Sequence, residues 1–165
     1  METKLVLNIR NFFTLGLFLF LYFSFGNQGL GHDKNLDLPA NKIFGKFKTP
    51  TKGGSEPIGF YSRGCLSGAE KLDDTGEYWQ VMRPARNRNW GHPETIKFTK
   101  DLSKKASEIG WKGLYIGDIS GPRGGPMPYG HQSHQIGLDV DIWMYPPKSL
   151  KLTKSERDKL EFMSV

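Results

Sequence analysis

The sequence lacks several features that often reveal a protein's class. Cys65 is the only cysteine among 165 residues, so the sequence offers no second thiol for a disulfide. The glycine-rich stretch at residues 117–130 contains no Gly-Lys-Ser/Thr, which argues against a phosphate-binding loop. Internal repeats and heptads are absent. The longest uncharged apolar run, residues 12–25, is shorter than the ~20 residues that span a bilayer.

That apolar run has the organisation of a secretory signal peptide covering residues 1–26. Lys4 and Arg10 precede it, and Ser24 and Gly26 are small residues suited to cleavage before Asn27. The alternative is an uncleaved signal anchor, because phenylalanine-rich runs insert well into membranes. We expect a cleaved signal, export to the periplasm, and membrane contact only transiently through this segment.

The remaining residues divide into a polar arm and one domain. Residues 27–56 are polar and rich in Lys, Gly and Pro, which predicts an extended N-terminal arm. Within residues 57–165, His92 and Pro93 open a predicted helix that Gly110 closes. The buried stripe of this helix is expected at Ile96, Leu102, Ala106 and Ile109.

Shorter elements are expected on both sides of this helix. Short strands or extended segments are predicted at residues 58–69, 78–82, 114–117 and 138–143, and an irregular groove rim at residues 117–130. Thr153 and Glu156 form a capping-box pattern, with Leu160 and Met163 beginning an apolar stripe. The predicted fold class is α+β, with a small antiparallel sheet that carries the functional site and flanking helices.

Residues 131–143 concentrate the chemistry of the chain. His134 and Asp141 supply one nitrogen and one anionic oxygen, a donor set that zinc accepts. Gly137 allows a tight turn between them. In the predicted strand at residues 138–143, alternation places Asp139, Asp141 and Trp143 on the site face and Leu138, Val140 and Ile142 on the core face. We therefore predict that His134 and Asp141 point into one cavity; the alternative is a surface polar cluster.

Two other groups of polar residues have open interpretations. Arg83, Arg86 and Arg88 could clamp a substrate carboxylate through their planar guanidinium groups, or form a solvated charged face. His92 is interpreted as a structural residue at a helix start rather than as a ligand.

The pattern His-x-x-Gly-x-x-x-Asp (His134, Gly137, Asp141) resembles the first zinc motif of the lysostaphin, D-Ala-D-Ala peptidase and hedgehog superfamily. Its frame, GHQSHQIGLDVDI at 130–142, looks like the penicillin-insensitive murein endopeptidases. Further segments resemble the same branch in the same order: GCLSGA (64–69), YWQVMR (78–83), NWGHP (89–93), IGD (116–118) and GG (124–125). The resemblance covers roughly residues 55–147.

The resemblance implies a zinc peptidase. Zinc would be held by His134, Asp141 and a downstream histidine, with His131 as a further ligand or a residue that orients the site, and Asp139 orienting a neighbouring histidine. The implied substrate is the peptidoglycan cross-link peptide, cut between D-Ala and diaminopimelate without an acyl-serine step, and hence without sensitivity to β-lactams. A D-Ala-D-Ala carboxypeptidase or dipeptidase shares the zinc motif but not the flanking segments.

One family motif has no counterpart here. The superfamily completes its site with a downstream His-x-His, whereas the histidines of this chain are His32, His92, His131 and His134. We expect the chain to correspond to the N-terminal part of an endopeptidase domain, with an incomplete sheet and no activity by itself. The alternative function is an inactive, peptidoglycan-binding remnant. The family pairs the residue corresponding to Cys65 with a C-terminal cysteine, and the other interpretation is a buried free thiol.

The charge of the chain is compatible with an anionic partner. The formal net charge is +6; removing residues 1–26, with Lys4, Arg10 and Glu2, lowers it by one to +5. A basic exported protein suits an anionic polymer such as peptidoglycan, whereas export argues against nucleic acid. Ordinary solubility explains a modest positive charge equally well.

Overall fold

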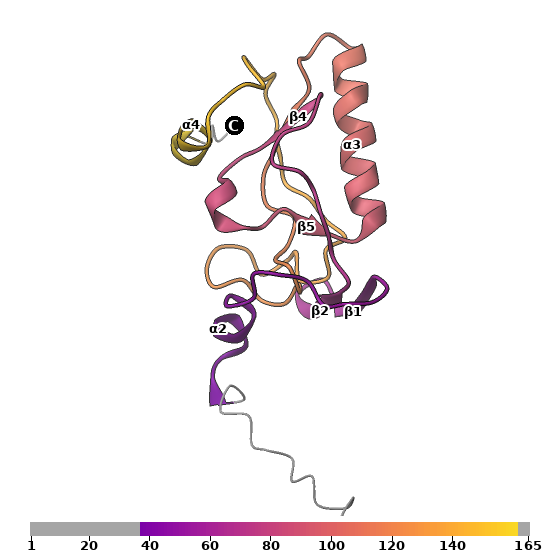
Figure 1. The fold of residues 1–165 in the computed structure, drawn as a ribbon, viewed down its shortest axis with the longest axis vertical. Coiled ribbons are helices and arrows are strands. Elements are labelled where there is room, and N and C mark those ends of the chain that lie inside the picture. The colour runs from indigo at the N-terminus through magenta and orange to yellow at the C-terminus, as the bar shows by residue number, and fades with distance from the viewer. Residues whose placement is uncertain (1–36, 162–165) are drawn as a thin grey trace, which may run out of the picture. The chain divides into compact units, whose positions relative to one another are not determined.

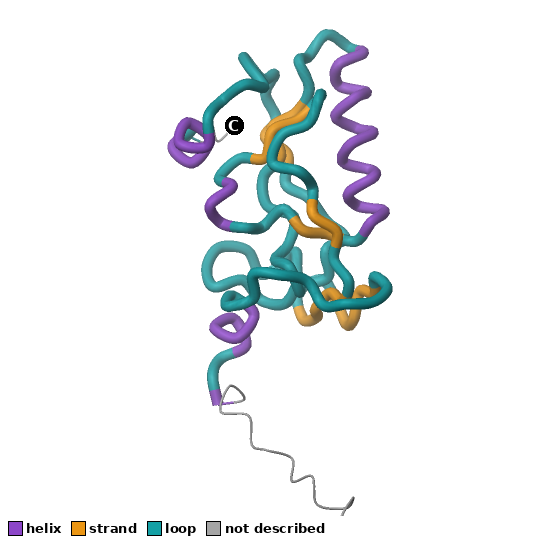
Figure 2. The backbone as a smooth tube through the Cα atoms, in the orientation of Figure 1, coloured by secondary structure: helices purple, strands orange, loops and turns teal. Residues whose placement is uncertain are grey.

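The computed structural model describes residues 37–161, which belong, apart from Asp37, to one compact unit, Leu38–Val165. The predicted signal peptide therefore lies outside the described residues, and the boundaries at residues 26 and 56 remain predictions. Figure 1 shows small strands flanked by helices, and most of the backbone between them is loop (Figure 2). Within residues 37–161, no helix has the length and apolar character needed to cross a membrane.

A three-stranded sheet lies at the centre of this unit. Its strands are β4 (Trp79–Val81), β6 (Leu114–Ile116) and β7 (Ile142–Trp143), in the order β4-β6-β7. β6 and β7 are antiparallel, whereas β4 and β6 are parallel. The predicted α+β class is confirmed. One pairing is parallel because the chain crosses from β4 to β6 through a helix, as parallel strands require.

That crossover helix is α3 (Pro93–Glu108), and its predicted start is confirmed. His92 is its N-cap and accepts a hydrogen bond at Nδ1 from the Glu94 N–H, at 3.3 Å. The buried face includes two hydroxyl residues, Thr99 and Ser103, which donate to the carbonyls four residues earlier. Ile109, predicted to be buried, is 76% exposed, because the chain leaves the helix axis there at the C-cap.

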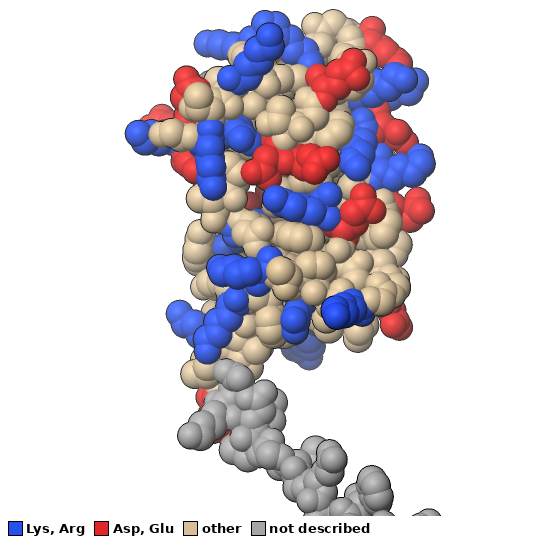
Figure 3. Space-filling model, in the orientation of Figure 1, with Lys and Arg blue, Asp and Glu red and all other residues tan. Residues whose placement is uncertain are grey.

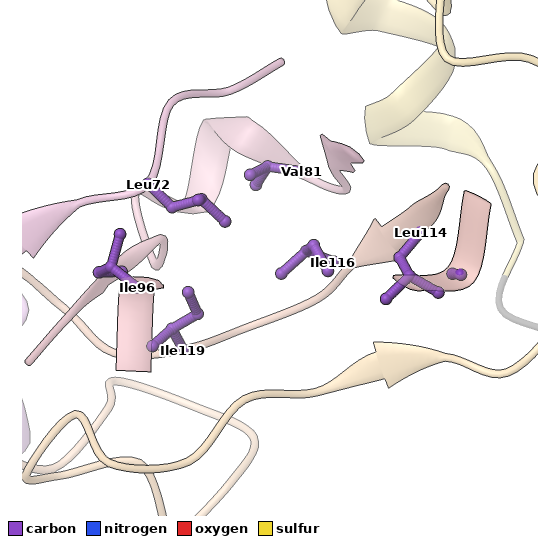
Figure 4. Packing of buried hydrophobic residues seen from close by; sticks show 7 residues of the cluster. Leu72, Val81, Ile96, Leu114, Ile116 and Ile119 are labelled. Carbon is purple, nitrogen blue, oxygen red and sulfur yellow. The ribbon is translucent and has the colours of Figure 1, made fainter. Parts of the chain in front are cut away.

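The face of the sheet toward α3 carries the larger apolar core. Alternate residues of β6, Leu114 and Ile116, point to this side (Figure 4). Val140 and Ile142 pack against the same core, as the sequence predicts. The buried members of the core are Leu72, Val81, Ile96, Ala106, Leu114, Ile116 and Ile119.

A second, smaller core lies on the opposite face of the sheet. Met82, Tyr115 and Trp143 are buried there against the C-terminal segment, which contributes Leu152 and Leu160, among others. This segment ends in α4 (Lys154–Lys159), whose predicted capping box between Thr153 and Glu156 is present. The helix is shorter than the predicted stripe, since Leu160 already leaves the helical conformation; residue 163 lies outside the described residues.

Shorter elements complete the unit. The hairpin of β1 (Glu56–Phe60) and β2 (Arg63–Ser67) is antiparallel, and β3 (Glu70–Lys71) pairs with β5 (Trp90–Gly91). A 3-10 turn, η2 (Pro84–Arg86), follows β4. The arm predicted to be extended contains a short helix, α2 (Ala40–Phe44), which brings Phe44 against Gly125 of the irregular loop at residues 117–130. Lysine and arginine side chains are interspersed with acidic ones on the face shown in Figure 3.

Candidate metal centre

The segment from His134 to Asp141 is folded by two residues in the left-handed backbone region. Gly137 has φ +66°, and a Cβ there would lie 2.5 Å from Leu66 Cδ2 and 3.1 Å from Gly91 Cα. The predicted turn at Gly137 is therefore confirmed, and only glycine fits it. His134 has φ +69°, a conformation in which histidine is more common than most residues.

The predicted strand at residues 138–143 is shorter than expected, since only Ile142–Trp143 forms regular strand. Asp139 Oδ2 accepts a hydrogen bond from the His134 N–H at 3.2 Å. This bond closes residues 134–139 into a loop instead of an extended strand. Leu138, predicted to face the core, is 49% exposed as a result.

Backbone hydrogen bonds place Asp141 beside the end of β6. The Gly117 N–H donates to the Asp141 carbonyl at 2.8 Å, and the Asp141 N–H donates to the Asp118 carbonyl at 2.9 Å. A Cβ at position 117 would lie only 2.9 Å from Asp141 Cβ, so glycine permits this close approach. Asp141 and Asp118 consequently lie close together beside the C-terminal end of β6.

His131, His134 and Asp141 form a group able to hold a metal ion, with one donor atom from each within 4.8 Å of the others. Asp141 bridges the two rings: Oδ1 lies 3.4 Å from His134 Nε2, and Oδ2 lies 3.3 Å from His131 Nε2. Two ligands bonded to zinc at about 2.0–2.1 Å and at tetrahedral angles are separated by about 3.3 Å. Both histidine–aspartate distances are close to this value, through different oxygens of Asp141, and the three donor atoms lie within 4.8 Å of one another. The predicted approach of His134 to Asp141 is confirmed. The cavity beside this group is lined by Asp141 but not by His134, so the prediction of one shared cavity is not confirmed.

Asp139 occupies the other side of the His134 ring. Its Oδ2 lies 3.0 Å from Nδ1, a close ionic contact, although Nδ1 has no hydrogen bond of regular geometry. A carboxylate at Nδ1 leaves Nε2, which faces Asp141, as the nitrogen for a metal. This is the orienting position predicted for Asp139.

The two carboxylates control the protonation of the buried His134. Burial by itself lowers the pKa of this imidazole, but Asp139 and Asp141 outweigh burial and raise the pKa to about 10. Burial raises the pKa of Asp141, whereas His134 and His131 lower it, and the net result is a pKa below the usual value. Negative charge on both sides of the ring thus favours a cation there, either a proton or a metal ion.

Asp118 is a site residue to which the sequence assigned no role. It is 5% exposed and lies 3.9 Å from His131 Nε2. Its Oδ2 accepts from Arg88 at 2.8 Å and from Arg86 at 3.3 Å. Its position immediately after a predicted strand could have identified Asp118 as a candidate site residue. Which charged groups face its carboxylate depends on long-range packing.

The three predicted arginines occupy different environments. Arg88 is buried between Asp118 and Tyr129. Its guanidinium carbon lies 4.3 Å from the centre of the Tyr129 ring, and its Nη2 donates a hydrogen bond to the Tyr129 carbonyl. Arg86 joins the same carboxylate and is 26% exposed. Arg83 makes no ion pair with any residue in the described range, and its guanidinium lies 5.7 Å from the Trp143 ring.

A cavity of about 450 Å³ opens beside the metal-binding group. Both His131 and Asp141 contribute to its wall, together with Asp118 and two of the arginines. The lining residues are Met82, Arg83, Arg86, Gly117, Asp118, His131, Asp141, Ile142 and Trp143. Its mixture of apolar and charged residues suits a polar ligand of peptide size.

The other predicted residues are not members of this group. Cys65 is on β2, half-buried and opposite Ile58, with a free thiol. His92 caps α3, in agreement with its predicted structural role, and His32 lies outside the described residues.

Comparisons with known proteins indicate the family of this chain. A sequence model of the penicillin-insensitive murein endopeptidase family matches residues 57–165. Three relatives from Escherichia coli, in O1:K1 / APEC and in strains SMS-3-5 and S88 (O45:K1), bear that same description. Each is 42% identical to this chain over 104 residues. The matched part is 63% of this chain but 38% of each relative.

Proposed function

The chain belongs to the penicillin-insensitive murein endopeptidase family, and from this premise we propose that it carries the zinc-binding part of a peptidase acting on peptidoglycan. The substrate would be the cross-link peptide, cut at the amide between D-Ala and diaminopimelate. The observation that carries the proposal is the bridging of His134 and His131 by Asp141 at 3.4 and 3.3 Å.

The residues proposed to hold the ion are His131, His134 and Asp141. When bound, zinc supplies a water with a pKa near 7 and polarises the scissile carbonyl. Asp139 orients His134 so that Nε2 faces Asp141. Asp118 pairs with Arg88 and, at a longer distance, with Arg86, and its carboxylate lies 3.9 Å from His131 Nε2.

The cavity gives the substrate a place beside these donors. A peptide lying against Met82 and Trp143 would bring its amide to the side of the cavity lined by His131 and Asp141. Hydrolysis of this kind requires no covalent acyl-enzyme, so β-lactams, which act by acylating a nucleophile, have no target in it.

Zinc uptake tests the proposed metal ligands. We expect the purified chain to bind zinc only weakly, because three protein donors leave the remaining position to water, as measured by equilibrium dialysis and metal analysis. His134→Ala and Asp141→Asn should reduce that uptake further. His92→Ala is the matched control, because the His92 imidazole caps α3 and is not a member of the donor group. Its main-chain N–H, which donates to the Gly137 carbonyl at 2.9 Å, is kept in this variant. Equal zinc content in all four proteins would contradict the proposed ligands.

The proposed location is the periplasm, reached through the signal peptide predicted at residues 1–26. N-terminal sequencing of the exported protein should begin near Asn27. Material that still contains residues 12–25 would show an anchor instead.

A further inference from the structure

Arg83 differs from its two neighbouring arginines because its charge is not matched. Arg86 and Arg88 share the carboxylate of Asp118 at 3.3 and 2.8 Å. No carboxylate among the described residues pairs with Arg83, although it lines the same cavity.

The backbone holds Arg83 in a fixed and unusual conformation. It has φ +53°, which costs about 1–2 kcal/mol for a residue with a Cβ. Its N–H donates a hydrogen bond to the Arg157 carbonyl at 3.3 Å. Arg157 is itself buried, and its Nη1 donates hydrogen bonds to the carbonyls of Asp74 and Val81. Strain of this kind is concentrated at functional sites.

The guanidinium group is also supported by an aromatic surface. It lies 5.7 Å from the centre of the Trp143 ring, and Trp143 is buried in the smaller core. An arginine held by an aromatic ring keeps its planar donors available for a carboxylate, which they bind through two parallel hydrogen bonds.

We propose that Arg83 forms a carboxylate-binding subsite of the cavity, selecting peptides that carry a free carboxylate next to the amide that faces His131 and Asp141. This inference rests on the proposed function, since it names the substrate class of that site. Arg88 is excluded from this role by its burial against Asp118, and Arg86 is partly neutralised by the same carboxylate.

The test compares two probes that differ only in this carboxylate. N-acetyl-D-Ala-D-Ala and its C-terminal amide would be titrated into the full chain at saturating zinc, with binding followed by calorimetry. We expect the acid to bind at least about tenfold more tightly than the amide, and Arg83→Gln to remove that difference without changing the affinity for the amide. Arg83→Lys should restore part of it, and Arg63→Gln, an exposed arginine on β2, should leave it unchanged.

Three results would overturn the subsite. They are equal binding of acid and amide by the unmodified chain, equal weakening of both probes by Arg83→Gln, and an acid preference that survives this substitution. The last would mean that the carboxylate binds the metal directly. Zinc content and thermal unfolding would be measured on the same samples. Loss of the acid preference with normal zinc uptake supports the subsite, whereas zinc uptake unaffected by Asp141→Asn contradicts the proposed function alone.

Discussion

At the scale of single residues, the sequence predicted that His134 and Asp141 lie close together, but not how the charged residues around them are paired. His134, Gly137 and Asp141 are close in the chain, so their spacing alone implied a shared site. Asp118 and Arg88 are separated by 30 positions and meet because backbone hydrogen bonds join residues 88–90 to residues 119–120. A sequence cannot show which of three nearby arginines such a carboxylate will neutralise.

The buried Arg88–Asp118 pair should contribute strongly to stability. Arg88→Leu leaves Asp118 buried with only the partly exposed Arg86, and removes the bond to the Tyr129 carbonyl. We expect unfolding in urea to show a loss of about 3 kcal/mol. The double variant Arg88→Leu/Asp118→Leu should recover part of this loss, and Arg63→Leu on exposed β2 is the control. A loss below about 1 kcal/mol, as for surface pairs, would contradict this role.

The raised pKa of His134 predicts how zinc binding depends on pH. Because that pKa is about 10 in the metal-free protein, zinc must displace a proton throughout the neutral range. The apparent association constant should rise about tenfold per pH unit between pH 6 and 8. Calorimetry in buffers of different ionisation enthalpy should show about one proton released per zinc bound. An affinity independent of pH would contradict it.

The same group affects the metal-free protein in the opposite direction. A folded-state pKa above the unfolded value near 6.5 stabilises the fold fully below pH 6.5. That contribution declines as the pH rises toward about 10. The metal-free chain should therefore unfold more easily at pH 9 than at pH 6, and His134→Ala should reduce this difference.

At the scale of elements, the sequence predicted the starts of α3 and α4 more accurately than the lengths of the strands. The caps of α3 and α4 consist of neighbouring residues, so the sequence predicted both starts. The length of a strand depends on its partners, and residues 138–141 have side-chain and backbone partners at the candidate metal centre instead of a regular ladder. The parallel pairing of β4 with β6 likewise required knowledge of how α3 packs.

The cap of α4 should determine whether this short helix stays docked. Thr153 Oγ1 accepts from the Glu156 N–H, and the Glu156 side chain accepts from the Thr153 N–H. Thr153→Ala should cost about 1 kcal/mol in the free energy of unfolding. Ser107→Ala removes a hydroxyl from the last turn of α3 without removing an N-cap, and provides the control. If both variants unfold alike, the capping box is not what holds α4.

At the scale of the whole molecule, the proposed centre has three protein donors among the described residues. The sequence contains no histidine after Asp141, and so no His-x-His of the kind that the family resemblance implies. We expect these 165 residues alone not to convert cross-linked muropeptide dimers to monomers. A fusion to the C-terminal part of an Escherichia coli relative should do so, as followed by chromatography. Comparable rates for both proteins would show that the site needs no further donor.

The turn η2 lies between two left-handed residues, Arg83 and Asn87, with φ +53° and +54°. Glycine satisfies such a backbone without steric cost, and asparagine tolerates it better than arginine. In a library of random variants sorted only for folded protein, glycine should therefore become enriched at both positions. Sorting the same library for retention of the acid probe should leave glycine acceptable at position 87 and eliminate it at position 83. The divergence of these two enrichment profiles would separate what the backbone prefers from what the ligand requires.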